Sequence, residues 1–536
     1  MKSKKKLNVK NKICPLVIFP FIVGILTGVL IFAFKISASF VIDKSNEIYA
    51  FVRANPKYLP LLLIVAVVIG VIASLILKFA KECRGGGIPT AVASIRGLMP
   101  MKWVQGAFVL FGSALLTFFV GVPLGNEGPS VQMGAATGKG ASNLFGKKNR
   151  AWERYNMTGG ACSGFAIATG SPMSGVVFAL EEAHRRFSPT LFLVAGVSVL
   201  GGTLTNKLLS TLFGVDTALF HISIDNVMPL KYLWTAVVIG VFCGLFSILF
   251  SVVYQSIRSR RKQNIEQKER FWRIGLIFFA VALLGFFCQD ILGSGHAVVE
   301  RIFERHIVWY IVVLAFVIRA AFMIFANNEG VSGGLFVPTL AFGAMIASVL
   351  AEGMIALGLV EEQYYAILIV VGMTSFLAAS SRIPLTAMTF AAEGLCVATN
   401  IIPVIIGVVI AYFTAEISGK LSLADTVIEI RAHGARKGRD AIIVDTHMTV
   451  QKGAFASGME IRDILWPPTC TVLSVDKKDK ASHATAICEG DVLHLHYRTY
   501  DPDETIRLLS YILGEQQEDE TTRKKIGKEG HVVPED

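Results

Sequence analysis

The chain has 536 residues, of which 53% are hydrophobic and only 17% are charged. Soluble domains carry about 25% charged residues, and disordered chains need low hydrophobicity, so the composition excludes both classes. The eight cysteines have no CxxC spacing and lie mostly in apolar runs, which favours buried thiols over a disulfide framework or a metal site. We therefore expect a polytopic membrane protein with no cofactor and no bound metal.

The N-terminus, residues 1–13, is rich in lysine and precedes an apolar run from Pro15 to Phe34 that is long enough to span a bilayer. No small-residue cleavage site follows, so we expect a retained first helix with its basic end in the cytoplasm. Further apolar stretches recur up to about residue 421. The clear ones are 60–80, 104–124, 190–213, 232–254, 274–293, 307–326 and 401–417.

Five other apolar segments are shorter and are broken by glycine and proline. Non-helical backbone at membrane depth survives only where it lines a cavity or is buried in protein. These segments therefore predict the functional part of the membrane domain. They are 85–98, 125–138, 159–182, 330–350 and 372–392.

A basic loop from Arg258 to Arg273 indicates a cytoplasmic connection near mid-chain, and it is too short and too closely flanked by spans to favour a nucleic-acid surface. After about residue 425 the character changes. Residues 440–516 predict a small α+β cytoplasmic domain, and the charged tail, 517–536, is expected to be disordered. The protein is thus expected in the cell membrane, with several passes and both termini in the cytoplasm.

Alternation of apolar and polar residues defines the elements of the small domain. Strands are expected over 440–450, 469–476 and 492–497, and an amphipathic helix over 503–513.

The sequence repeats itself where it is least regular. The pattern P-[ST]-x-x-x-G-A occurs at 129–135 and again at 338–344, and residues 172–181 match 384–393 at nearly the same offset. Transporters built from repeats hold their substrate near the membrane midplane with interrupted helices. We therefore predict two related halves, about 14–255 and 274–425, with a site between them.

Three glycine-rich turns each place a proline in the first turn of an expected helix. They are Gly85–Pro89, Gly125–Pro129 and Gly333–Pro338. The first N–H groups of a helix lack internal partners, and this end of the helix dipole is positive. Several such ends converging at mid-membrane form an anion site without full cationic charges. The sequence has no TVGYG-like filter or ring of acids for a cation, so we expect the transported ion to be an anion.

These three segments, in this order, together with the Glu181–Glu182 pair and the duplicated halves, resemble the CLC family of chloride channels and chloride/proton antiporters over residues 14–425. The resemblance implies an all-α membrane domain of two inverted repeat halves. It also implies a homodimer in the lipid bilayer, with a separate pathway for chloride in each subunit and no nucleic-acid partner. The chain is expected to be a transporter and not an enzyme, because no nucleophile–base constellation appears among the spans.

Two carboxylates match functional positions of the family. Glu127 matches the gating glutamate, which occupies the anion position and leaves it when protonated. Glu182 matches the internal glutamate that passes protons in antiporters, although it could also be a structural partner of the arginines that follow it. Glu181 is expected to be structural. An acid at membrane depth is functional by default, which favours gating over helix capping for Glu127.

The resemblance also implies a set of anion-binding residues. Phe336 and Val337 are expected to offer backbone N–H groups, and Phe336 also the positive edge of its ring. The whole set is Gly86, Gly87, Ile88, Asn126, Gly128, Gly334, Leu335, Phe336, Val337 and Ala424.

Three positions depart from the family pattern. Gly86 stands where the family has a serine, Ala424 (or Leu423, if the alignment slips by one) where it has a tyrosine, and Asn126 where it has an arginine. Each lost hydrogen bond weakens anion coordination by about 1 kcal/mol. We expect a chloride/proton antiporter with a weakened inner gate.

Two alternatives within transport stay open. Gly86 and Asn126 resemble the fluoride/proton antiporter branch, against which stand Glu182 and the intact Gly334–Pro338 segment. A passive chloride channel, regulated by voltage or ligand, is favoured by Gly86 and Ala424 and disfavoured by Glu182.

The small domain resembles the TrkA-C domain of potassium-conductance regulators in segments 458–465, 469–476, 489–497 and 505–513. The resemblance implies dimerisation and a ligand-sensing regulatory role, with cyclic di-AMP as one candidate ligand. A dimerisation domain without a ligand is the alternative. A potassium transporter, suggested by this domain alone, is disfavoured by the expected anion site. His494 and His496 alternate on one strand and fit a solvated edge better than a metal site.

Overall fold

The protein is described here from a computed structural model, whose described residues form eighteen α-helices and one small sheet. The structure describes residues 14–85, 87–144, 147–215, 219–220, 222, 224, 226–259, 267–288, 291–435, 440–475, 484–515, 521–526 and 532–533. Gly86, residues 1–13 and most of the basic mid-chain loop therefore lie outside the described residues.

Long apolar helices form the frame of the membrane domain, and the clear apolar stretches are confirmed as helices. Within the described ranges, nine helical segments are long and apolar enough to cross a membrane. The long helices are α2 (Phe19–Ala54), α3 (Leu59–Phe79), α5 (Trp103–Val120), α9 (Pro189–Phe213), α10 (Leu233–Ser259), α11 (Gln267–Phe287), α13 (Trp309–Glu329), α14 (Phe336–Ala356), α15 (Tyr365–Ser381) and α17 (Ile401–Ile417).

The broken segments form short or interrupted helices in the interior, as predicted. Proline at the first or second position fixes the start of several of them, because its missing N–H is not needed there. These elements are α4 (Ile88–Ile95), α6 (Glu127–Leu144), α7 (Glu153–Thr169), α8 (Pro172–Phe178) with the following π-helical turn η5 (Ala179–Ala183), and α16 (Pro384–Gly394). The broken segment 330–350 instead leads into the long helix α14. Two further short helices, α12 (His296–Phe303) and α18 (Leu423–Ala435), lie outside the predicted segments.

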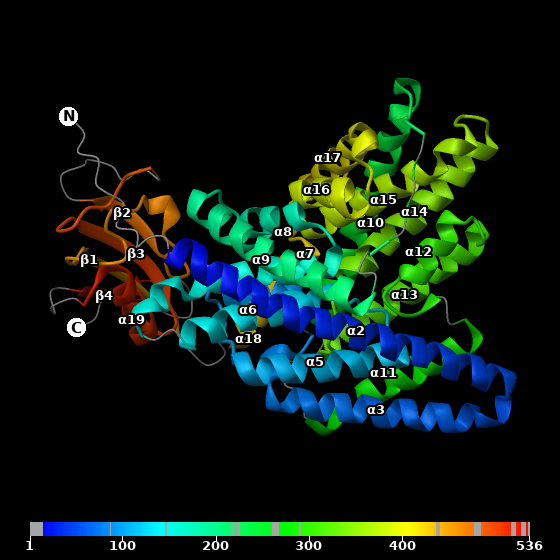
Figure 1. Ribbon diagram of the computed structural model, residues 1–536, viewed down its shortest axis with the longest axis horizontal. Helices are drawn as coiled ribbons and strands as arrows, with labels where there is room; N and C mark the ends of the chain where they lie inside the picture. The colour runs from blue at the N-terminus through cyan, green and yellow to red at the C-terminus, as the bar shows by residue number, and fades with distance from the viewer. Residues whose placement is uncertain are drawn as a thin grey trace.

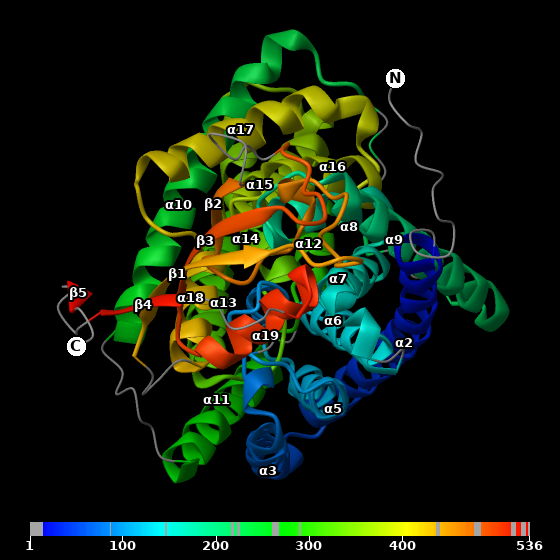
Figure 2. The ribbon, with the colours of Figure 1, turned by 90° about the vertical axis from the view of Figure 1, so that its left-hand side faces the viewer.

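Small residues let the interior helices approach closely. A Cβ placed on Gly138 of α6 would overlap the backbone of Asn156 in α7, and one on Gly343 of α14 would overlap that of Gly372 in α15. The two halves meet where α8 lies against α16, and the hydroxyl of Ser174 donates to the carbonyl oxygen of Thr386 at 3.0 Å. In both ribbon views α3 lies at one edge of the helical body and α17 at the other (Figures 1 and 2).

The C-terminal domain packs against one end of the helical body (Figure 1). Its predicted strands and helix are confirmed as β1 (Ile442–Thr449), β2 (Thr471–Val475), β3 (Val492–Thr499) and α19 (Pro502–Leu513). The sheet is antiparallel with the order β2-β3-β1-β4-β5. Alternate residues of β3, including Leu493, Leu495 and Tyr497, point into a core shared with Leu509 of α19.

The tail differs from the expectation of disorder in its described part. Residues Thr521–Ile526 form β4, which pairs with the edge of β1 that β3 leaves open, and Val532–Val533 form β5. The open edge of a strand presents unpaired backbone groups, and a charged segment can satisfy them without adding to the core. Composition alone gives no signal for such pairing.

The histidines of β3 make local contacts. The ring of His494 stacks on that of His447 in β1 with centroids 4.4 Å apart, and His496 Nδ1 lies 2.7 Å from a carboxylate oxygen of Asp445.

Candidate functional site

The two halves of the chain join through a pair of glycines at the interrupted segments. The N–H of Gly125 donates to the carbonyl oxygen of Gly334 at 2.8 Å, and the N–H of Gly334 donates back to Gly125 at 2.6 Å. This isolated two-residue bridge joins the turn before α6 to the turn before α14. The sequence prediction that these two segments meet in one place is thus supported directly by the backbone.

A third turn joins them at the same point. A Cβ placed on Gly128 would lie 2.6 Å from the Cα of Gly334 and 2.7 Å from the Cα of Gly87, so only glycine permits this approach. Gly87 precedes α4 and has φ of 149°, a value that side chains rarely adopt. The starts of α4, α6 and α14 therefore converge, with their positive ends and first N–H groups directed to a common region.

Glu127 begins α6 and is fully buried at this junction. Its carboxylate faces its own N–H and the N–H of Val337 at the start of α14. Within the described residues neither carboxylate oxygen forms a hydrogen bond of regular geometry. A buried, loosely held carboxylate beside two helix starts can leave when it is protonated, because burial disfavours its charge and the amides favour it.

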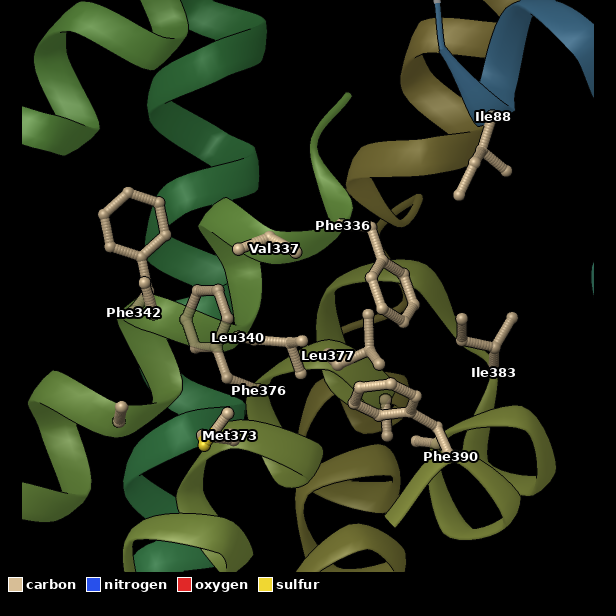
Figure 3. Packing of buried hydrophobic residues seen from close by; sticks show 14 of the residues in the cluster. Ile88, Phe336, Val337, Leu340, Phe342, Met373, Phe376, Leu377, Ile383 and Phe390 are labelled. Atoms are coloured by element: carbon tan, nitrogen blue, oxygen red, sulfur yellow. The ribbon is translucent and has the colours of Figure 1, made fainter. Parts of the chain in front are cut away.

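Phe336 closes the junction on the side of the second half. Its ring makes edge-to-face contacts with Phe165 of α7 and Phe390 of α16, at centroid distances of 5.1 and 5.2 Å. Figure 3 shows the ring of Phe336 facing Phe390, with Ile88 of α4 across from it. Leu335 caps α14, and Val337 is buried beneath Phe336. The N–H groups of the first turn of α14 are thus held in place by packed aromatic rings.

The N–H of Gly87, which was predicted to bind the anion, is hydrogen-bonded to a residue that the sequence analysis did not select. The N–H of Gly87 donates to Oε1 of Gln132, a buried residue of α6, at 3.1 Å. That N–H is therefore turned toward α6, and Ile88 supplies the first backbone group of α4 itself. A glutamine inside the glycine-rich α6 is the only sequence signal for this contact. The predicted residue Gly86 lies outside the described residues.

Glu182 lies near the opposite end of α4 from Gly87. It is 3% exposed, and its backbone carbonyl accepts from Nη2 of Arg96 at 2.7 Å, just after α4 ends. Arg96 also donates to the carbonyl oxygen of Ala183 at 2.9 Å. Arg96 thus forms its hydrogen bonds with backbone carbonyl groups and not with the carboxylate of Glu182. Oε2 of this carboxylate is buried without a hydrogen-bond partner among the described residues.

Ala424 lies in the first turn of α18, which packs against α4, and it is 4% exposed. The next residue, Asp425, pairs with Arg185 through both carboxylate oxygens at 2.7 Å. This ion pair ties the start of α18 to the segment that carries Glu182. The methyl group of Ala424 offers no hydrogen-bond donor at this position.

A large cavity lies on the side of the junction away from the C-terminal sheet. Its volume is about 720 Å³, and we call it the distal cavity. Asn126 lines it, next to Glu127. Two charged residues that the sequence reading did not select shape it: Lys35 of α2 lines it, and the buried Arg319 of α13 donates to the carbonyl oxygens of residues 291–293 in its wall. Charges inside apolar spans are the signal that could have found both.

Residues 463–466 of the C-terminal domain form hydrogen bonds to the membrane domain, and we call this the interdomain contact. Arg154 of α7 donates to two carbonyl oxygens of the segment at 2.7 and 3.0 Å, and Arg186 donates to a third at 2.7 Å. Ser188, the cap of α9, donates to Oδ1 of Asp463 at 2.6 Å. The hydroxyl of Tyr155 bonds the backbone of the same segment.

Converging helix starts around a buried carboxylate, inside a bundle of membrane-length helices, define a membrane ion-transport protein. The chain belongs to the voltage gated chloride channel family, whose family model matches residues 66–416.

Three solved structures share the fold. A slow cyanobacterial Cl⁻/H⁺ antiporter matches with a TM-score of 0.69 and 21% identity, covering 78% of this chain and 98% of that one. A eukaryotic CLC transporter matches at 0.64 and 18%, covering 78% and 74%. A CLC-type fluoride/proton antiporter matches at 0.64 and 20%, covering 77% and 97%.

Proposed function

We propose that the protein exchanges chloride for protons across the cell membrane, with its C-terminal domain in the cytoplasm. The observation that carries the proposal is the burial of the Glu127 carboxylate where the starts of α6 and α14 meet. A charged carboxylate there competes with chloride for the same N–H groups. A protonated one gives them up. The competition links one proton to the passage of anions.

Glu182 supplies the second proton position. It is buried beside Arg96 and lies four residues before Arg186, which binds the C-terminal segment, so it lies toward that domain. A proton that enters there can reach Glu127 without crossing the distal cavity. The inner gate between them is weak in this chain, because Ala424 carries no hydroxyl group.

The test is paired flux measurement in liposomes that contain the purified protein. An imposed chloride gradient is expected to drive proton movement in the wild type. Glu127→Gln and Glu182→Gln are expected to carry chloride without protons. Glu361→Gln, which changes an exposed carboxylate in a loop, is the matched control and is expected to behave like the wild type. Chloride flux in the wild type with no proton movement would reject exchange and favour a passive channel.

Fluoride/proton antiport is the second candidate, because Asn126 lines the distal cavity where the family arginine would stand. The same liposomes decide between the two ions. Fluoride flux at least about a hundredfold faster than chloride flux, a difference of about 2.7 kcal/mol in barrier, would replace chloride by fluoride in the proposal.

We further propose that the C-terminal domain is a TrkA-C-like regulatory module that acts through the interdomain contact. Four side chains of the membrane domain bind one short segment of it, those of Arg154, Tyr155, Arg186 and Ser188. Leu465 packs in one cluster with Tyr155 and Leu191. A ligand that shifts this segment changes the support of α7 and α9. Cyclic di-AMP is the first ligand to test.

The test compares the wild type with Asp463→Ala, which removes the acceptor of Ser188, in liposomes exposed to cyclic di-AMP. Binding that alters flux in the wild type but not in Asp463→Ala supports coupling through this contact. If binding alters flux equally in the wild type and in Asp463→Ala, the coupling does not depend on the bond between Ser188 and Asp463. The absence of binding to the full-length protein rejects this ligand and favours a purely dimerising domain.

We also propose a homodimer. Apolar side chains of α8 and α16, such as Met173 and Leu385, are more than half exposed beside the carboxylates that cap these helices. Polar groups at a membrane surface are costly when they face lipid, and a second subunit covers them. Mass measurement in detergent micelles or nanodiscs checks this, and a monomer at all concentrations would reject it.

A further inference from the structure

Lys35 is a cation within an apolar stretch of α2, ahead of the charged residues Asp43 and Lys44. It lies near the middle of α2, between Phe34 and Ile36, where a charged side chain is costly unless it serves a purpose. Its Nζ donates to the carbonyl oxygen of Ile167 in α7 at 3.1 Å. This bond fixes the ammonium at the contact between α2 and α7, and the side chain still lines the distal cavity.

The ammonium is close to the gate. The charges of Lys35 and Glu127 are near enough to interact, and Lys35 also acts on His296, the first residue of α12. Asn126 lines the same cavity directly before Glu127. An anion in the distal cavity therefore meets Lys35 just before it reaches the position that the Glu127 carboxylate occupies.

The guanidinium of Arg319 is bound by backbone carbonyl oxygens in the cavity wall. The acids that line the cavity lie farther from Glu127. Asp43 is eight residues beyond Lys35 on α2, about 12 Å toward the end of the helix, and Glu300 is one turn beyond His296 on α12. Both acids repel anions from the outer part of the cavity, so the attraction is concentrated at its inner end. A single ammonium beside a movable carboxylate attracts an anion without trapping it, because the carboxylate competes for the same charge.

We propose that Lys35 is a positioning residue that holds an incoming halide at the inner end of the distal cavity, next to Glu127. The inference rests on the proposed function and deepens it, since it assigns a further anion position at the face away from the C-terminal domain. Lys35 supplies there the positive charge that Asn126 does not carry. The ligand is a halide, chloride in the first instance.

The experiment measures initial chloride flux from the face away from the C-terminal domain, over a range of chloride concentrations on that face, together with thermal unfolding. The variants are Lys35→Met and Lys35→Arg. The control is Lys44→Met, on the same helix, where the lysine is paired with Glu47 and does not line the cavity. Lys35→Met is expected to raise the half-saturating chloride concentration about tenfold with a nearly unchanged maximal rate. Lys35→Arg keeps the positive charge and is expected to keep the half-saturating concentration close to that of the wild type.

Two results would overturn the assignment. An unchanged half-saturating concentration in Lys35→Met shows that no anion is held there. A drop in thermal stability and maximal rate without a change in that concentration shows that Lys35 only fastens α2 to α7. Failure of the proposed function is a separate result: a wild type that carries neither chloride nor fluoride. In that case, calorimetric titration of chloride into wild type and Lys35→Met still decides whether Lys35 binds the ion.

Discussion

Glu181 and Glu393 each cap the start of a helix in the other half of the protein. Glu181 follows α8 and accepts the N–H of Thr386 in α16 at 2.7 Å, whereas Glu393 ends α16 and accepts the N–H of Met173 in α8 at 2.8 Å. The two contacts are equivalent under the repeat that relates the halves. Each carboxylate satisfies first-turn N–H groups and lies at the positive end of the partner helix. The expectation that Glu181 is structural agrees with this exchange.

The exchange separates the roles of two adjacent acids. We predict that Glu181→Ala lowers the stability of the membrane domain by about 1–2 kcal/mol, because it leaves the start of α16 without its cap. Proton-coupled flux is expected to persist in the protein that remains folded. Thermal unfolding in detergent and liposome flux measure the two effects, and Glu393→Ala is expected to match Glu181→Ala. Loss of proton movement at unchanged stability would contradict this prediction.

Gly128 is predicted to tolerate no side chain. The methyl group of Gly128→Ala would meet the backbone at Gly87 and Gly334, which cannot move without separating the three helix starts. Such overpacking costs about 1–3 kcal/mol or more, and flux is expected to fall to background. Gly112→Ala is the matched control, because a Cβ on this glycine of α5 meets nothing within 4 Å. Equal flux in the two variants would show that the junction is looser than described.

Tyr155 is predicted to hold the interdomain contact. Tyr155→Phe removes the hydroxyl that bonds the backbone of Asp463 and Leu465, at a cost of about 1–3 kcal/mol for the groups left unpaired. Hydrogen–deuterium exchange of residues 461–468 is expected to rise by about tenfold or more. Tyr412→Phe, in α17, is the control. Unchanged exchange at 461–468 would mean that Arg154, Arg186 and Ser188 hold the contact without Tyr155.

Cys470 is predicted to resist alkylation. Burial raises the pKa of the Cys470 thiol from 9.0 to about 12, so the reactive thiolate is absent at pH 7–9 in the folded domain. Cys488, which is exposed, is expected to react first with iodoacetamide. Because the folded state keeps the proton that the unfolded state loses above pH 9, this thiol reduces the stability of the domain as the pH rises from about 9 to 12. Mass spectrometry of the labelled peptides measures the order, and equal rates at pH 8 would contradict it.

Much of the fold was predictable because its signals are local. Lengths of apolar runs predict spanning helices, and proline after glycine predicts the starts of α4, α6 and α14, since both follow from backbone chemistry. The repeated motif predicts that Gly125 and Gly334 meet, because duplicated halves place equivalent segments at a shared interface. Glu127 was selected on other grounds, its match to the gating glutamate of the family and its position as an acid at membrane depth.

The remainder depends on contacts between distant segments. The sequence around Gly87 does not predict that Gln132 accepts the N–H of Gly87. The sequence around Arg154 likewise does not predict that Arg154 binds the backbone of residues 463–466. Lys35 could have been selected from the sequence, because a lysine in an apolar span is unusual. Its partner Ile167 could not, because it lies 132 positions away in the chain. Pairing of β4 with β1 was also beyond prediction, since the composition of the tail favours disorder.

The short helix α4 connects the junction of the helix starts to the side of the membrane domain that binds the C-terminal domain. Its eight residues span about 12 Å, and all eight side chains are enclosed by protein. Gly87 at one tip touches Gly128, while the carbonyl oxygen of Ile95 at the other tip is held by Arg154. Arg154 also binds the C-terminal domain, so under the proposed regulation a displacement of that domain is expected to reach the contact between Gly87 and Gly128 through this one helix.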